Sequence, residues 1–153
     1  MEIRKLETEE KQNTKKLYEE VFSEDSKSFV DYYYEEKLKD NQIYAVEEDG
    51  EIQAMLHLNP YELAVNGSRK DVNYIVAVAT KKEYRSRGYM RALLNTVLER
   101  MHSEKVPFTF LMPAAEAIYR PYDFRYIYDQ CMQEVKKDET ADDRNRESEP
   151  QKE

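Results

Sequence analysis

The amino-acid sequence predicts one domain of mixed α/β type, in which helices cover both faces of a central sheet of six to seven strands. Two turn dipeptides, Asp49-Gly50 and Asn66-Gly67, separate short β-type segments and predict an antiparallel meander in the first half of the chain. An apolar run at 74–79 is followed by an amphipathic helical pattern and by a second apolar run at 108–112. This order of strand, helix and strand predicts a parallel β-α-β unit with a right-handed crossover.

The composition limits the classes of function. The chain has 153 residues, which is enough for one domain with its own core. Its 24 Lys and Arg against 32 Asp and Glu give a net charge of -8, which disfavours nucleic acid as a partner. No apolar stretch reaches the roughly 20 residues of a membrane span, and no signal peptide is recognisable, so we expect a cytoplasmic protein without a membrane partner. With a single cysteine, Cys131, and two histidines, no metal site is expected.

The domain is expected to span residues 1–135, and 136–153 is expected to be a disordered charged tail. The tail contains no aromatic residue and no aliphatic residue larger than Ala. Such a segment cannot bury enough apolar surface to offset the entropy lost on ordering.

The N-terminal elements are predicted from hydrophobic periodicity. Ile3 alternates with charged neighbours in a first strand at 2–7, and Thr8 with two glutamates opens a helix that carries apolar residues at 17–22. A second helix is predicted at 26–38, where aromatic and aliphatic residues recur at about 3.6-residue spacing.

Four β-type segments follow, at 42–47, 51–58, 61–65 and 72–79. The last of them is apolar almost throughout from Tyr74 to Ala79, so we expect it to be central and covered on both faces.

The second half of the chain contains the β-α-β unit. An amphipathic helix of about four turns is predicted at 89–102, with one face on the sheet. The run at 108–112 is predicted to be a buried strand parallel to 72–79. A short helical turn at 114–119 and a last strand at 126–135 complete the domain.

A basic loop with one glycine joins the central strand to the long helix. The N-terminus of a helix presents unpaired backbone N–H groups and the positive end of the helix dipole, and Gly88 permits a tight turn there. Arg85, Arg87 and Arg91 add positive charge at this point of an acidic chain. The loop therefore suits a pyrophosphate group. From these residues alone, a plain basic loop capped by glycine is an equal alternative.

The same segment resembles the pyrophosphate loop of the GNAT superfamily of acetyl-CoA-dependent N-acetyltransferases. That loop has Gln or Arg, two residues, Gly, one residue and then Gly or Ala, between a central strand and a helix. Arg85 and Gly88 match this pattern, and Met90 stands at the last small position. The resemblance implies the GNAT fold, with acetyl-CoA as the acetyl donor.

A narrower resemblance, over about residues 1–130, is to the first acetyltransferase domain of the enhanced intracellular survival (Eis) family. It is seen in the stretches 78–80, 83–91 and 118–124. It implies that backbone groups of 78–80 align the pantetheine and thioester and that the arginine-rich loop holds the pyrophosphate. It also implies that two alanines line the far wall of the cofactor site. The cofactor-binding residues would then be Val78, Ala79, Thr80, Arg85, Ser86, Arg87, Gly88, Tyr89, Met90, Arg91, Ala114 and Ala115.

The Eis resemblance also implies a catalytic tyrosine at Tyr119. A phenol within hydrogen-bond reach of the departing CoA sulfur can protonate it as a general acid. Tyr122 and Tyr126 are alternatives. Longer relatives use the terminal carboxylate of a further domain as general base. In this chain Glu116 or Glu83, acting through water, is the local alternative.

The two histidines have structural explanations and are assigned no catalytic role. His57 lies in the middle of a predicted strand, and His102 lies at a helix C-terminus, where a cation suits the dipole.

We therefore expect an acetyl-CoA-dependent N-acetyltransferase of the EC 2.3.1 type, in which a primary amine attacks the thioester directly. Charge and aromatic content suit a cationic acceptor, which leaves aminoglycoside, polyamine and lysine open. The alternative is a non-catalytic acyl-CoA-binding module or a truncated domain of a larger acetyltransferase. An oligomer is compatible with the sequence, and monomer, dimer and hexamer all stay open.

Overall fold

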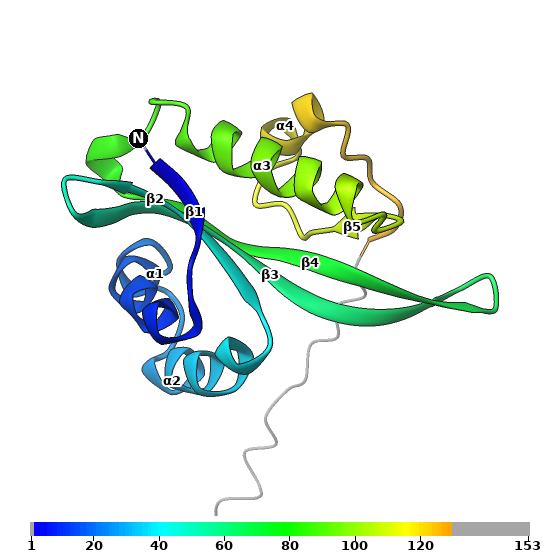
Figure 1. Ribbon diagram of the computed structural model, residues 1–153, viewed down its shortest axis with the longest axis horizontal. Coiled ribbons are helices and arrows are strands. Elements are labelled where there is room, and N and C mark those ends of the chain that lie inside the picture. Colours follow the sequence, from blue (N-terminus) through cyan, green and yellow to red (C-terminus); the bar gives the residue numbers. More distant parts are fainter. Residues whose placement is uncertain (1, 130–153) are drawn as a thin grey trace, which may run out of the picture. The chain divides into compact units, whose positions relative to one another are not determined.

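The computed structural model describes residues 2–129, and five strands in this part of the chain form one mixed sheet in the order β1-β2-β3-β4-β5. The strands are β1 (Glu2–Lys5), β2 (Gln42–Glu48), β3 (Glu51–Val65), β4 (Ser68–Thr80) and β5 (Thr109–Phe110). Strands β1 to β4 are antiparallel neighbours, and β5 runs parallel to β4 (Figure 1). The predicted meander and parallel unit are confirmed.

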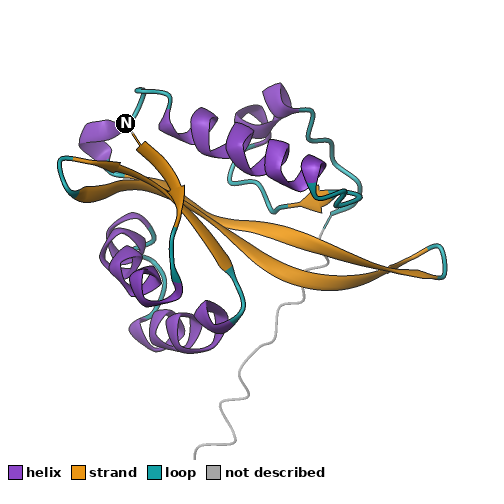
Figure 2. Cartoon of the chain, in the orientation of Figure 1, coloured by secondary structure: helices purple, strands orange, loops and turns teal. Residues whose placement is uncertain are grey.

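The chain divides into two compact units, Met1–Ala114 and a second unit that begins at Ala115. The helices of the first unit are η1 (Thr8–Thr14), α1 (Lys15–Val21), α2 (Lys27–Glu36), η2 (Lys37–Lys39), η3 (Lys82–Tyr84) and α3 (Tyr89–Ser103) (Figure 2). The second unit contains α4 (Glu116–Tyr119) and η4 (Arg120–Tyr122). The predicted positions of the long helix and of the short helical turn are confirmed.

Local capping explains where the first helices begin. Glu7 and Glu10 form a reciprocal capping box, and η1 begins one residue after the cap. The helical segment changes from 3-10 to α geometry at Lys15. The hydroxyl of Ser26 accepts a hydrogen bond of 3.2 Å from the backbone N–H of Phe29 at the start of α2.

The described residues form five strands instead of the expected six to seven, in part because two predicted strands are one. The segments 51–58 and 61–65 are continuous in β3 and pass through Pro60, which pairs with Asn73 of β4. The pairing of β2 with β3 ends at Leu58, so Pro60 lies where β3 has a neighbour on one side only. An edge position tolerates the missing proline N–H. The predicted last strand at 126–135 is not formed over 126–129, and 130–135 lies outside the described residues.

The expected central strand, β4, is less buried than β3. Strand β3 is buried at seven consecutive residues, 53–59, whereas β4 alternates between buried and half-buried positions from Val72 to Thr80. The predicted neighbour at 108–112 forms a strand only at Thr109 and Phe110, so most of β4 has no strand on that side within the described residues. The charged tail predicted at 136–153 lies outside them as well.

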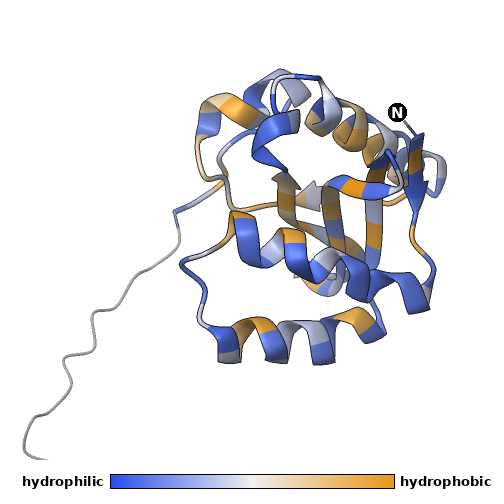
Figure 3. Ribbon diagram, turned by 90° about the vertical axis from the view of Figure 1, so that its left-hand side faces the viewer, coloured by the Kyte–Doolittle hydropathy of each residue, from blue (hydrophilic) through white to orange (hydrophobic). Residues whose placement is uncertain are grey.

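Helices cover both faces of the sheet in the first unit, as predicted. Residues of α1 and α2 form one core cluster with Ile43, Met55 and Ala79. Helix α3 contacts β2, β3 and β4 from the opposite side and buries Leu93, Leu94 and other apolar residues of one face. Figure 3 shows hydrophilic and hydrophobic residues alternating along these helices, as expected for amphipathic elements.

A buried histidine lies in the core on the α2 side of β3. The Nδ1 atom of His57 is 3.0 Å from the hydroxyl of Tyr33, which also donates to the Oδ1 atom of Asn59 at 3.3 Å. Removal of the imidazole from water lowers the pKa of His57 to about 3. The neutral ring is therefore part of the packed core.

Candidate cofactor-binding site

A β-bulge interrupts β4 at the point where sequence analysis predicts thioester contacts. Met55 pairs with Ala79 and His57 with Val76, so Ala77 and Val78 together lie opposite Leu56. Ala77 has a φ of 52°, in the left-handed region that a residue with a Cβ seldom adopts. A bulge disrupts the ladder and redirects the strand locally. The backbone near Val78 is thereby freed from the regular pairing pattern.

The edge of β4 beyond the bulge is open. Strand β5 pairs only with Asn73 and Tyr74, and among the described residues no strand pairs with 75–80 on that side. Backbone N–H and C=O groups that face away from β3 therefore lack ladder partners there. Such an edge can receive an extended ligand that carries amide groups.

The loop after β4 leads directly to the N-terminus of α3. Gly88 is the N-cap residue with a φ of 83°, and no side chain caps this end of the helix. The backbone N–H groups of Tyr89, Met90 and Arg91 have no acceptor inside the helix. The first turn contains no acidic residue. An anion therefore meets free donors and a positive dipole end.

Exposed arginines surround this helix terminus. The guanidinium of Arg87 lies 4.5 Å from the ring centroid of Tyr84, and the Tyr84 ring stacks on the Tyr89 ring at 6.1 Å. The Nε atom of Arg85 donates to the backbone oxygen of Thr80 at 3.3 Å. These contacts hold positive charge close to the loop and leave guanidinium donors available.

Tyr89 fixes the first turn of α3 to the sheet. Its side chain is 5% exposed, and its hydroxyl donates a hydrogen bond to the carboxylate of Glu48 at the end of β2. This hydrogen bond raises the pKa of Tyr89. Sequence analysis gave Tyr89 only a pyrophosphate contact and missed this anchor, because no local motif links two residues that are 41 positions apart.

The predicted site residues fall into two groups. The first unit brings 78–80 and 85–91 together through η3, and it ends at Ala114. The second unit holds Ala115 as the N-cap residue of α4 and Tyr119 as its last residue. The half-buried Tyr119 ring lies edge-on to Phe124, with ring centroids 5.9 Å apart.

The alternative acid and base candidates are also placed. Glu83 lies in η3 next to the basic loop, and Glu116 forms an ion pair of 3.2 Å with Arg120 in the second unit. Tyr122 is half-buried, whereas Tyr126 is 60% exposed. Tyr119 and Tyr122 are therefore both less exposed than Tyr126.

The predicted site is an open edge and a loop rather than an enclosed cavity. Two concavities, of about 450 and 250 Å³, lie elsewhere in the first unit, and neither is lined by a predicted cofactor-binding residue. Within residues 2–129, no helix combines the length and the apolar character that a bilayer crossing requires.

The sequence matches a known family. Residues 2–127 match the family model described as acetyltransferase (GNAT) domain. The chain belongs to the GNAT family. No curated protein matches this sequence.

Solved structures give the same fold for this GNAT domain. A probable N-acyltransferase from Enterococcus faecalis V583 is 24% identical, with a TM-score of 0.73 over 79% of this chain. This GNAT domain spans only 31% of the length of that protein. A predicted acetyltransferase from Clostridium acetobutylicum, solved with acetyl-CoA, is 13% identical with a TM-score of 0.73, over 87% of this chain and 95% of its own.

A third solved structure is an aminoglycoside 6'-N-acetyltransferase from Acinetobacter haemolyticus. It is 16% identical, with a TM-score of 0.69, and the match covers 90% of this GNAT domain and 100% of that enzyme. At this level of identity the likeness concerns the fold.

Proposed function

We propose that this chain is an acetyl-CoA-dependent N-acetyltransferase that acts on a primary amine. The observation that carries the proposal is the open edge of β4, which runs past the bulge at Ala77 directly into the uncapped N-terminus of α3. Extended amide groups of pantetheine suit the strand edge, and a pyrophosphate suits the helix terminus. The acetyl-CoA in the related Clostridium structure supports the same donor.

The proposed cofactor-binding residues lie mostly in the first unit, and Ala115 begins the second. Backbone groups of Val78, Ala79 and Thr80 align the pantetheine arm. Residues 85–91 hold the pyrophosphate through backbone N–H groups and arginine side chains. Ala114 and Ala115 are proposed for the far wall of the cofactor.

The transfer step follows from the chemistry of a thioester. The lone pair of a neutral amine attacks the acetyl carbon, and a backbone N–H near Val78 polarises the carbonyl oxygen. The new C–N bond forms, the C–S bond breaks, and the sulfur leaves with the electron pair of that bond. Tyr119 gives its phenolic proton to the sulfur and regains a proton from water. The nitrogen loses its extra proton to Glu83 or Glu116 through water.

The acceptor is proposed to be a cationic amine. The chain carries a net charge of -8, and this charge attracts cations to its surface. An amine that is charged in solution must lose a proton before attack, which is why a nearby carboxylate or a water chain is needed.

The Eis-like assignment is part of the proposal. The Ile118-Tyr119-Arg120-Pro121 sequence supports it, and so does the match of this chain to part of a longer Enterococcus protein. That partial coverage also favours a second candidate function, a non-catalytic acyl-CoA-binding module or one domain of a larger acetyltransferase.

Thiol release in the presence of acetyl-CoA and a panel of amines tests the proposal. The panel contains an aminoglycoside, spermidine and a lysine peptide, and calorimetry measures acetyl-CoA binding in parallel. We expect turnover with at least one amine and a loss of about 100-fold or more in kcat for Tyr119→Phe, with little change in acetyl-CoA affinity. Tyr128→Phe, at a residue that is 77% exposed, is the matched control.

The outcomes separate the two candidate functions. Acetyl-CoA binding without turnover on any amine would favour the binding module. Equal rates for the wild type and Tyr119→Phe would exclude Tyr119 as the acid, and absence of acetyl-CoA binding would overturn both candidates.

A further inference from the structure

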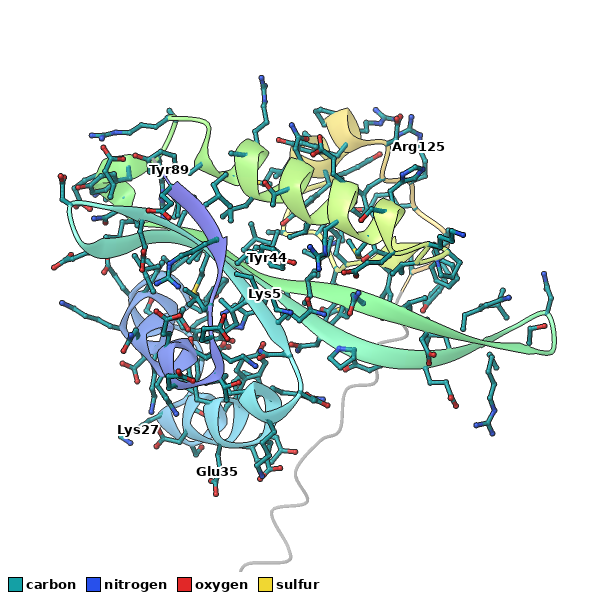
Figure 4. All side chains as sticks on the ribbon, in the orientation of Figure 1. Lys5, Lys27, Glu35, Tyr44, Tyr89 and Arg125 are labelled. Atoms are coloured by element: carbon teal, nitrogen blue, oxygen red, sulfur yellow. The ribbon has the colours of Figure 1, made fainter. Side chains whose placement is uncertain are left out.

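One of the two concavities of the first unit has the features of a binding site. Its volume is about 450 Å³, and its walls come from β1, from Tyr44 of β2 and from the C-terminal half of α3. Lys5 and Tyr44 are opposite each other in the β1–β2 register, so their side chains leave the same face of the sheet. Figure 4 shows the two residues close together near the C-terminal end of β1.

Tyr44 presents an unpaired hydroxyl to this concavity. The residue is 5% exposed, yet its hydroxyl has no hydrogen-bond partner among residues 2–129. Burial raises the pKa of Tyr44, and Arg100 lines the same concavity. The hydroxyl is not among the fully buried polar atoms that lack a partner, so it is open to the concavity, where a ligand oxygen can accept its hydrogen bond.

Among the described residues, not all charged groups that line the concavity take part in ion pairs. Lys5 and Glu99 line the concavity, and within the described part of the chain neither takes part in an ion pair. Arg100 binds Glu104 through its Nε atom at 2.5 Å, which leaves its terminal nitrogens free. Two cationic donors, one hydroxyl and one carboxylate therefore converge on a single concavity.

By contrast, four of the five N–H donors of Arg4 bind carboxylates. It donates to both carboxylate oxygens of Glu10 and to both of Glu47, at 2.7 to 3.0 Å. Arg4 therefore completes an internal network, and its charge is neutralised there by two carboxylates. The available positive charge comes from Lys5 and Arg100.

We propose that this concavity binds a small zwitterion of the amino-acid class. The ligand carboxylate would accept hydrogen bonds from the Lys5 ammonium, the Tyr44 hydroxyl and the Arg100 guanidinium. The ligand ammonium would face Glu99. A volume of about 450 Å³ accommodates a molecule of this size.

This site is separate from the cofactor loop. Thr96 and Ser103, which mark the two ends of the α3 wall, lie roughly 12 and 22 Å along the helix from Gly88. The proposal therefore does not depend on the acetyltransferase assignment, and variants in the concavity leave the acetyl-CoA loop untouched.

A binding experiment with defined probes tests the proposal. The proteinogenic L-amino acids are screened at millimolar concentration by thermal shift, and the best ligand is titrated calorimetrically. Propionate and methylamine, each carrying one of the two charges, and inorganic phosphate serve as partial probes. We expect an amino acid to bind at least tenfold more tightly than any partial probe.

The variants assign the binding to this concavity. Tyr44→Phe and Glu99→Gln are each expected to weaken the amino acid about tenfold, because each removes one polar contact. Glu24→Gln, at an exposed residue outside the concavity, is the control. The proposal is overturned if no amino acid binds, if phosphate or propionate binds as tightly, or if both concavity variants keep wild-type affinity.

Discussion

The hydroxyl of Tyr89 in the first turn of α3 donates a hydrogen bond to the carboxylate of Glu48 at the end of β2. The Tyr84 ring stacks on the Tyr89 ring, and the guanidinium of Arg87 lies over the Tyr84 ring. The side chain of Tyr89 therefore connects the helix terminus that is proposed to bind pyrophosphate with the β2–β3 hairpin.

Tyr89→Phe is expected to weaken acetyl-CoA binding several-fold and to lower the urea midpoint, because the variant leaves the Glu48 carboxylate without its donor. Tyr84→Phe keeps the ring stack and is the control. Calorimetry and urea unfolding measure the two effects. Equal acetyl-CoA affinity in both variants would contradict an orienting role of Tyr89.

Helix α3 is expected to depend on its buried face. Leu94 is fully buried against the sheet, and Leu94→Ala should lower the free energy of unfolding by about 2 to 5 kcal/mol. Asn95→Ala, on the exposed face of the same helix, should change it by less than about 0.5 kcal/mol. Urea unfolding compares the two variants, and similar losses in both would argue against this packing.

The stability of the protein should depend on the titration of His57. The pKa of His57 is about 3 in the folded protein and 6.5 for the ordinary group, so between these values the unfolded chain binds a proton that the folded chain does not. The histidine contribution is fully present above pH 6.5 and is lost as the pH falls toward 3.

Because of His57, the free energy of unfolding of the wild type should fall by up to about 1.4 kcal/mol for each pH unit below 6.5. His57→Gln should lack this part of the fall. Urea unfolding at several pH values between 5 and 7.5 measures it, with His102→Gln at the exposed end of α3 as control. An unchanged slope in His57→Gln would show that His57 is not the titrating group.

A second pH effect is expected from Arg4 at lower pH. Its hydrogen bonds lower the pKa of Glu10 from 4.5 to about 2, so the contact stabilises the fold above pH 4.5 and this stabilisation is lost as the pH falls through 2. Arg4→Met should therefore unfold at lower urea than wild type at pH 7, and the gap should narrow toward pH 2.

Arg69→Met removes an exposed ion pair with Glu62 on the β3–β4 hairpin and should have little effect at any pH. If the gap between Arg4→Met and wild type stayed constant from pH 7 to pH 2, the carboxylate of Glu10 would not be its source.

Much of the fold follows from local patterns in the sequence. Asp49-Gly50 and Asn66-Gly67 adopt positive φ at both positions, as the two-residue hairpin turns require, and the period of α3 matches its buried face. The error at Pro60 has a tertiary origin. Proline ends a central strand, but it is tolerated at an edge. The local sequence around Pro60 does not show that the pairing of β3 with β2 stops at Leu58.

The candidate site was predictable in part for the same reason. Gly88 marks the turn before α3, because a positive φ favours glycine. The bulge at Ala77 has no such mark, since alanine occupies the left-handed conformation where glycine would be expected. The anchor between Tyr89 and Glu48 and the pairing of Lys5 with Tyr44 depend on strand register across the sheet, which local periodicity does not encode.

The loop ending at Gly88 is proposed to bind the pyrophosphate of acetyl-CoA. Calorimetric titration of acetyl-CoA, and separately of CoA, into the wild type and into Gly88→Val tests it most directly, since valine strains the φ of 83° at the helix cap. Arg87→Gln, which leaves the backbone unchanged, covers the case in which the valine variant does not fold. We expect micromolar binding to the wild type, no detectable binding to Gly88→Val and weaker binding to Arg87→Gln. No binding to the wild type, or wild-type affinity in both variants, would contradict it.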